Sequence, residues 1–283
     1  MKWYDTYLSV FEKPFEEVPG EIIERVSKKL HSMQSAEPVV SVVVIAHNEA
    51  SRLFGCLWSL SENITNYPIE IIGVDNHSTD NTAEVYKASG IPWYYEENQS
   101  CGYARNRGRM YAKGKYYICI DSDTLYPPAY IQILTDRLER PGIVAVSSLW
   151  SFLPDKRFPT WQLKLYEFLR DIHLWLLAFK RPEMSVRGMV FAYNLEYGRT
   201  IDYRVDIIRG EDGMMALGLK KYGKISFIRN RKARALTSNA MLYSDGGIGS
   251  AFKKRILRSF KHWQGYFVKK ASYDDQESNM IKK

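Results

Sequence analysis

The chain has 283 residues, a formal net charge of +8 and a hydrophobic content of 45%. This length suits one large domain or two small ones, and the composition is ordinary for a globular protein. No apolar run approaches the ~20 residues that a membrane-spanning helix needs. The first residues include acids where a signal peptide would be apolar, so we expect no export signal and a cytoplasmic location. The three cysteines are scattered, which argues against a disulfide or zinc framework.

Positive charge is concentrated towards the C-terminal end of the chain. Between Arg229 and Lys270 there are 11 lysines and arginines and one acid, Asp245. Such a segment suits an anionic partner, such as nucleic acid, anionic lipid or a phosphorylated substrate, and it also suits a simple solvated surface. A nucleic-acid-binding protein would spread its basic residues over an extended surface and would show a recognised motif. Neither feature is found, so we expect no nucleic-acid partner.

Helices and strands are expected to alternate through the first half of the chain. Residues 1–38 form an N-terminal extension with a helix between Ile22 and Met33, where apolar residues recur at helical spacing. Strands are expected at 39–46, 69–74, 91–95 and 116–120, and helices between Leu53 and Leu60, at 82–88 and at 102–112. This alternation indicates a doubly wound, mostly parallel α/β sheet, which binds ligands at the carboxyl ends of its strands. No glycine-rich dinucleotide or P-loop motif follows a strand.

Three of these strands end in polar or acidic residues. His47 and Glu49 follow the first strand, Asp75 ends the second, and Asp121 and Asp123 follow the fourth. In an extended segment, Asp121 and Asp123 point to the same side. Their mutual repulsion would raise their pKa values unless a cation compensates, and oxygen ligands suit Mg²⁺ or Mn²⁺. The alternative is that the two aspartates cap a turn and the next helix, but capping alone explains the convergence of three strand ends poorly.

The second half of the chain is less regular. We expect helices at 127–139, at 160–180 and from Glu211 to Gly223, and strands at 143–147, 186–193, 225–228 and 233–237. A last helix, with an apolar stripe from Phe252 to Phe267 and basic residues beside it, either docks on the domain or contacts an anionic membrane surface. The expected organisation is an extension (1–38), one domain (39–237) with halves at 39–124 and 125–237, and a basic C-terminal segment (238–283).

Five motifs in order resemble the family-2 glycosyltransferases of the GT-A fold. They read SVVVIAHNEASRL, IIGVDNHSTDNT, GYARNRGRMYAKGKYYICIDSDT, RGMVFAY and GED. The resemblance runs from residue 39 to residue 237. It implies transfer of a sugar, usually with inversion, from a nucleotide-sugar donor to a hydroxyl of an acceptor, here a glycan or lipid-linked glycan. The basic end could then hold the enzyme at the inner face of the membrane.

The resemblance also implies the roles of individual residues. The nucleotide-binding pocket would be lined by Ala46, His47, Glu49, Asp75, Arg105, Asp121 and Ser122. Asp75 would contact the base, generally uracil, and Asp121 the ribose. Asp123 would hold a divalent metal, Mn²⁺ or Mg²⁺, against the diphosphate. Asp212 would be the general base, with Glu211 as the competing candidate. The acceptor side would include Gly188, Ala192 and Glu211.

Two departures from the family pattern and three alternatives remain. The loop after the second strand reads Asp-Asn-His where Asp-Asp-Gly is common, and the Gln-x-x-Arg-Trp motif of processive synthases is absent, so we expect a non-processive enzyme. The first alternative is a sugar-phosphate nucleotidyltransferase, which would show a glycine-rich basic loop where this chain reads AHNEASRL. The second is a basic nucleic-acid-binding protein. The third is a transferase without turnover, which the joint presence of Asp123 and Asp212 disfavours.

Overall fold

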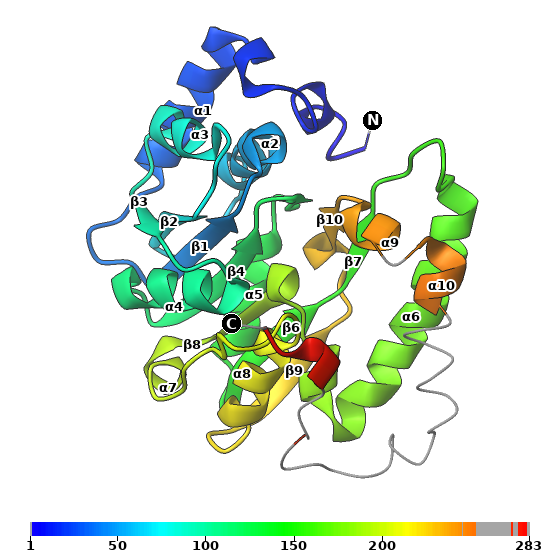
Figure 1. The fold of residues 1–283 in the computed structure, drawn as a ribbon. Coiled ribbons are helices and arrows are strands. Elements are labelled where there is room, and N and C mark those ends of the chain that lie inside the picture. Colours follow the sequence, from blue (N-terminus) through cyan, green and yellow to red (C-terminus); the bar gives the residue numbers. More distant parts are fainter. Residues whose placement is uncertain (1, 245, 253–272, 274–276, 282–283) are drawn as a thin grey trace.

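The computed structural model describes residues 2–244, 246–252, 273 and 277–281 (Figure 1). Within these residues, seven strands form one sheet in the order β3-β2-β1-β4-β8-β6-β9. The strands are β1 (Val40–Ala46), β2 (Ile69–Asn76), β3 (Trp93–Glu96), β4 (Tyr116–Asp121), β6 (Ile143–Ser148), β8 (Phe191–Asn194) and β9 (Lys224–Ile228). Strand β8 runs antiparallel to both of its neighbours, and the remaining pairs are parallel. The expected mostly parallel α/β sheet is confirmed.

Helices cover both faces of this sheet, as in a doubly wound fold. Side chains alternate along β1, so Val42 and Val44 join one core while Val43 and Ile45 join the other. The first core includes residues of α1 (Gly20–Ser32), α2 (Ala50–Ser61), α3 (Thr82–Ser89) and α5 (Tyr130–Leu138). The second includes residues of α4 (Cys101–Tyr111) and α8 (Glu211–Leu219). Burial on both faces explains why the sequence of β1 is apolar throughout.

The order of the strands places a crevice between β1 and β4. The chain steps outward from β1 to β2 and β3, then returns through α4 to β4 on the other side of β1. Ile45 of β1 lies level with Asp121 of β4, and Ala46 lies level with Asp75 of β2. The polar residues that follow these strands therefore meet at one edge of the sheet, where α/β proteins bind ligands.

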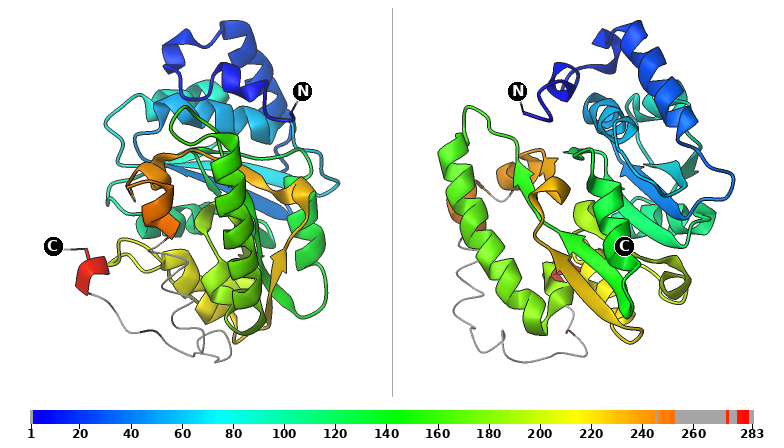
Figure 2. Two further views of the ribbon diagram at one scale, coloured as in Figure 1. Left: turned by 90° about the vertical axis from the view of Figure 1, so that its right-hand side faces the viewer. Right: turned by 180° about the vertical axis from the view of Figure 1, so that it is seen from behind.

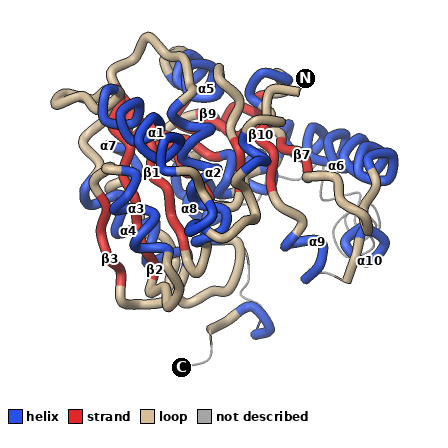
Figure 3. Tube along the Cα trace, turned by 90° about the horizontal axis from the view of Figure 1, so that it is seen from above, coloured by secondary structure: helices blue, strands red, loops and turns tan. Residues whose placement is uncertain are grey.

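A second, three-stranded sheet lies between the seven-stranded sheet and the long helix α6 (Thr160–Lys180), as the view from above shows (Figure 3). It contains β5 (Thr124–Leu125), β10 (Ala235–Thr237) and β7 (Trp150–Phe152), with β10 in the middle. The short helices α7 (Leu195–Gly198), α9 (Ala240–Ser244) and α10 (Ile248–Phe252) complete the α-helices of the described chain. None of the helices in these residues has the length and apolar character needed to cross a membrane.

Several short segments are 3₁₀-helical. They are η1 (Tyr7–Ser9), η2 (Phe15–Glu17), η3 (Pro182–Ser185), η4 (Gly188–Val190), η5 (Arg231–Ala233) and η8 (Glu277–Asn279). The strand expected at 186–193 is therefore wrong over its first half, and only residues 191–194 belong to a strand. The strand expected at 233–237 shortens to β10 for the same reason, and the helix expected to reach Gly223 ends at Leu219. The helix expected from Phe252 to Phe267 lies outside the described residues beyond α10. Cys56 and Cys119 are buried and Cys101 is exposed, and all three are free thiols.

Candidate active site

A hollow of about 240 Å³ opens at the carboxyl ends of β1 and β4. It brings together most of the site candidates named from the sequence, and its lining is Ile45, Ala46, His47, Glu49, Asn76, Cys101, Ala104, Arg105, Asp121, Ser122, Asp123, Glu211 and Asp212. Three of the named candidates, Asp75, Gly188 and Ala192, are not part of this lining. Asn76, Cys101 and Ala104 line the hollow although no sequence argument singled them out.

Arg105 links the two halves of the site. It lies on α4 and is only 1% exposed. Its Nη2 donates to Oδ1 of Asp121 at 2.6 Å, and its Nε lies 3.1 Å from Oδ1 of Asp212 at the start of α8. The Arg105–Asp212 pair is close but is not aligned as a hydrogen bond. The guanidinium therefore holds the carboxylate at the end of β4 and the carboxylate at the start of α8, and it fixes their relative position.

The backbone at Gly188 packs directly against this pair. A Cβ atom at Gly188 would lie 2.1 Å from Nη2 of Arg105 and 2.6 Å from Oδ2 of Asp212. This close approach explains why glycine, which has no side chain, fits at this position. Ala192 is fully buried in β8, where it pairs with Ile118 and Val146. Gly188 thus stands behind the site and Ala192 inside the sheet.

Hydroxyl groups orient the carboxylate of Asp123. Its Oδ2 accepts from the Ser238 hydroxyl at 2.8 Å, and its Oδ1 accepts from the hydroxyls of Thr124 at 3.0 Å and Thr237 at 3.5 Å. Strand β10 delivers Thr237 and Ser238 by pairing with β5. The sequence gives no signal for this role, because Thr237 and Ser238 belong to no motif and lie far along the chain from Asp123.

Burial and repulsion between neighbouring carboxylates raise the pKa values of several acids in the hollow. Burial raises the pKa of Glu49 to about 7, with a further contribution from Asp123, against the opposing Arg52. Burial raises the pKa of Glu211 to about 8, and the adjacent carboxylate of Asp212 adds to it. Burial likewise raises the pKa of Asp212 and of Asp123. Both Glu211 and Asp212 lie in the first turn of α8, where the helix dipole favours ionised acids, but burial outweighs that effect.

The donor set of the hollow fits a divalent cation. Carboxylate oxygens are the ligands that Mg²⁺ and Mn²⁺ prefer, and a cation would relieve the repulsion that raises these pKa values. In the part of the chain that the structure describes, no three His, Cys, Asp or Glu side chains converge as a ready-made metal cage. A cation at Asp123 would therefore take its other ligands from phosphate oxygens and water, as Mg²⁺ commonly does.

A network of hydrogen bonds connects His47, at the hollow, with the end of β2. Nδ1 of His47 lies 2.7 Å from the carbonyl oxygen of Asn76, and Nε2 lies 2.7 Å from Nε2 of Gln99. Because an amide nitrogen only donates, Nε2 of His47 accepts and Nδ1 carries the hydrogen. Asp75 is 2% exposed, and its Oδ1 accepts from the backbone N–H of Ser78 at 3.2 Å. This network holds the ends of β1 and β2 in place.

Asn48 ties together two loops at the same edge. Its backbone has φ of 54°, and its side-chain oxygen accepts from the backbone N–H of Thr79 at 2.8 Å and of Asp80 at 3.3 Å. Asparagine tolerates this left-handed backbone better than most residues. The loop after β1 is thereby fixed to the loop after β2, a role that the sequence analysis did not assign.

Fold and site together define a doubly wound α/β protein with an acidic hollow between β1 and β4, where the strand order reverses. The model of the family described as glycosyl transferase family 2 matches residues 41–197, more than half of the chain. The chain therefore belongs to glycosyl transferase family 2, and the resemblance drawn from its motifs is confirmed.

Relatives and solved structures agree with this assignment. The uncharacterized glycosyltransferase YibD of Escherichia coli is 32% identical over 190 residues, which cover 58% of this chain and 55% of YibD. The glycosyltransferase GlyG of Streptococcus pneumoniae is 30% identical over 121 residues, 40% of each chain. The chain spans about half the length of the relatives that it matches.

Two solved structures share the fold at low sequence identity. The mannosyltransferase PcManGT from Pyrobaculum calidifontis, in complex with GDP-Man and Mn²⁺, has a TM-score of 0.57 and 17% identity, and the match covers 84% of this chain and 72% of that one. Glucosyl-3-phosphoglycerate synthase from Mycobacterium tuberculosis, in complex with Mn²⁺, UDP-Glc and phosphoglyceric acid, has a TM-score of 0.53 and 19% identity, with 90% and 87% covered. These likenesses support the GT-A fold.

Proposed function

We propose that this protein transfers a sugar from a nucleoside-diphosphate sugar to a hydroxyl group of an acceptor, with inversion at the anomeric carbon. The observation that carries the proposal is the convergence of Asp121, Asp123 and Asp212 at one hollow, with Arg105 between two of them. Membership of the family favours this reaction over the nucleotidyltransferase and nucleic-acid-binding alternatives.

The donor that we propose is a UDP-sugar. His47, which lines the hollow, and Asp75, which lies just outside the lining, would receive the base, and Asp121 would contact the ribose. Among the solved structures of this fold, one is described with GDP-Man and another with UDP-Glc, so both bases are compatible with the architecture. The choice of uracil follows the family pattern at Asp75.

The proposed chemistry uses one carboxylate on each side of the sugar. Asp123, oriented by Ser238, would hold Mn²⁺ or Mg²⁺, and such an ion acts as a Lewis acid that contributes several kcal/mol to the departure of a diphosphate. Asp212 would accept the proton of the acceptor hydroxyl, which contributes about 10²- to 10⁴-fold in rate. Arg105 would hold Asp212 in position, and its positive charge opposes the rise in the pKa of that carboxyl.

The acceptor that we propose is a glycan or lipid-linked glycan, extended by one or a few sugars. Residues 125–237 would form its side of the site and residues 39–124 the nucleotide side. The basic residues of the C-terminal segment would bring the enzyme to an anionic membrane surface.

A thermal-shift panel tests the proposal. Full-length protein is melted with UDP, GDP, ADP or CDP, each with and without Mn²⁺. A ligand at 100 times its Kd stabilises the folded state by about 2.7 kcal/mol, so a rise in Tm with UDP that depends on Mn²⁺ is expected. If no nucleoside diphosphate raises the Tm in the presence of Mn²⁺, the hollow is not a nucleotide site.

A further inference from the structure

Helix α6 exposes a continuous row of large apolar side chains. We call this row the α6 stripe, and its members are Trp161, Leu165, Phe168, Ile172, Trp175 and Phe179. Their spacing alternates between four and three residues, which places all six on one face of a helix. Trp161, Phe168 and Phe179 are 66%, 61% and 64% exposed. An apolar surface of this size facing water marks an interaction site in a folded protein.

The α6 stripe is not needed to hold α6 on the domain. The opposite face of the helix already packs inward through buried side chains that include Leu163, Leu174 and Leu177. Helix α6 runs down the front of the molecule in the left-hand view of Figure 2 and lies at its outer edge in the right-hand view, which is seen from behind. The stripe therefore faces outward, and its burial requires something beyond the described part of the domain.

Basic side chains border the α6 stripe. Lys164 and Lys180 are exposed on α6 itself, and Arg229, Arg231 and Lys232 are exposed on the connection between β9 and β10. The Arg229 guanidinium lies 5.3 Å from the ring of Trp175, which places this connection beside the stripe.

The acids of α6 lie beside that border, but arginines of the domain pair with them. Glu167 and Asp171 are the two acids in this helix, and both contact Arg234. The Glu167 carboxylate also accepts from the Ser151 hydroxyl at 2.9 Å and the Phe152 backbone N–H at 2.7 Å. The outer face is thus apolar along its centre and positive along its edge.

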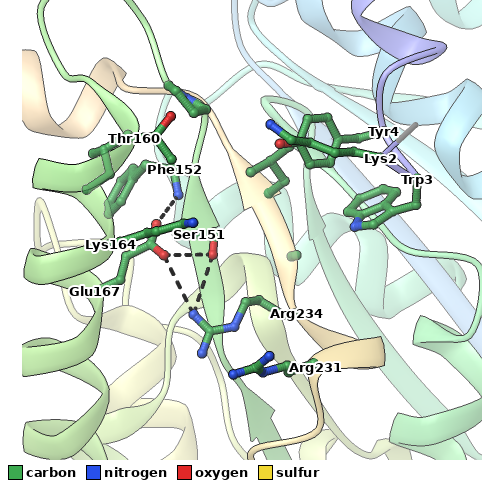
Figure 4. A pocket seen from close by; sticks show the side chains of 14 residues that line it. Lys2, Trp3, Tyr4, Ser151, Phe152, Thr160, Lys164, Glu167, Arg231 and Arg234 are labelled. Atoms are coloured by element: carbon green, nitrogen blue, oxygen red, sulfur yellow. Dashed lines mark hydrogen bonds and ion pairs between the residues drawn. The ribbon is translucent and has the colours of Figure 1, made fainter.

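A hollow of about 220 Å³ lies beside the first turns of the stripe (Figure 4). Four basic side chains and one acid stand around it, namely Lys2, Lys164, Arg231, Arg234 and Glu167. In the described residues, no hydrogen bond or ion pair holds the Lys164 ammonium or the Arg231 guanidinium, whereas Arg234 contacts Glu167 and Asp171. Within the described residues, Lys164 and Arg231 can therefore bind the phosphate oxygens of a ligand, and lysine and arginine both bind phosphate well.

We propose that the α6 stripe is a docking surface for an anionic lipid membrane. Its aromatic and aliphatic side chains would enter the interface, where tryptophan is favoured, while Lys164 and Arg231 contact lipid phosphates. Charge complementarity favours lipid over a second copy of this chain, because the positive border would face an identical positive border across a twofold contact. Docking does not depend on the transferase chemistry, so a variant of the stripe should still bind nucleotide.

Co-sedimentation with vesicles tests this surface. Full-length protein is mixed at low salt with vesicles of phosphatidylglycerol and phosphatidylcholine in equal amounts, and with vesicles of phosphatidylcholine alone. Binding to the anionic vesicles is expected, and it should weaken at high salt. The triple variant Trp161→Ser, Phe168→Ser, Phe179→Ser should bind at least about tenfold more weakly. Lys164→Gln and Arg231→Gln should each weaken binding about fivefold, from about 1 kcal/mol per cation.

A matched control uses apolar side chains that are equally exposed elsewhere. Ile64 and Met110 are 73% and 70% exposed, away from α6, and the double variant Ile64→Ser, Met110→Ser should bind vesicles like the unaltered protein. Equal binding by the triple and control variants overturns the proposal. So does a triple variant with unchanged vesicle binding and a lower Tm, which would mean that another segment of the chain covers the stripe. Loss of a dimer on sedimentation velocity, without any vesicle binding, would assign the stripe to a second copy and also overturn it.

Discussion

Replacement of Gly188 by alanine tests whether the buried ion-pair cluster is as tightly packed as the structure indicates. The new methyl group would lie 2.1 Å from Nη2 of Arg105 and 2.6 Å from Oδ2 of Asp212, both far inside contact distance. Arg105 is 1% exposed and already engaged with two carboxylates, so it has no free direction in which to move. The substitution therefore has to separate the ion pair or displace the backbone of η4.

The expected cost follows from these two routes. Overpacking a core with one methylene costs about 1–3 kcal/mol, and loss of one partner from a buried ion pair costs about 3–5 kcal/mol. We expect Gly188→Ala to lower the free energy of unfolding by about 2–4 kcal/mol in urea denaturation. A displacement of Asp212 by about 1 Å should also lower kcat about 10²-fold, if Asp212 is the base.

Gly213 provides the matched control, because it lies in α8 one residue after Asp212. A Cβ atom there would be 3.5 Å from the carbonyl oxygen of Glu183, an ordinary contact. Gly213→Ala should leave stability unchanged or raise it by about 0.5–1 kcal/mol through helix propensity. If Gly188→Ala unfolds at the same urea concentration as Gly213→Ala and keeps normal turnover, the cluster around Arg105 is not rigid and the reasoning fails.

Four further predictions concern the acids of the hollow. Asp123→Asn should abolish the Mn²⁺ dependence of UDP binding while the melting temperature without ligand is kept; unchanged dependence in a titration contradicts the metal assignment. Ser238→Ala should weaken Mn²⁺-dependent UDP binding about fivefold, because a hydrogen bond of about 1 kcal/mol to Asp123 is lost; calorimetry measures the Kd, and an unchanged value removes that role. Asp212→Asn should lower kcat about 10²- to 10⁴-fold and Glu211→Gln much less, and steady-state kinetics with the reverse order would exchange their roles. Finally, the pKa of Glu211 is raised from 4.5 to about 8, so its contribution to stability is complete below about pH 4.5 and is lost as the pH rises through about 8. The Tm should therefore fall between about pH 4.5 and pH 8. A Glu211→Gln variant whose Tm falls equally steeply over this interval would show that another group is responsible.

Local sequence pattern determined the first half of the fold. The apolar run of β1 is long enough to be read from sequence because the strand is buried on both faces, and β2 and β4 end in the polar residues Asn76 and Asp121. The alternation of strand and helix then fixes a doubly wound sheet, and that topology alone gathers the ends of β1, β2 and β4 at one edge. Asp121 and Asp123 could be recognised as a pair for this reason.

Only the tertiary structure decided how the second half completes the site. Asp212 meets Arg105 because α8 packs on the same face of the sheet as α4, and Ser238 meets Asp123 because β10 pairs with β5. These contacts join residues far apart in the chain, so no local periodicity encodes them. Residues 186–190 have strand-like composition, and nothing in their sequence indicates that the backbone at Gly188 passes close to Arg105 of α4. The raised pKa values of Glu211 and Asp212 likewise depend on burial, which a sequence pattern does not measure.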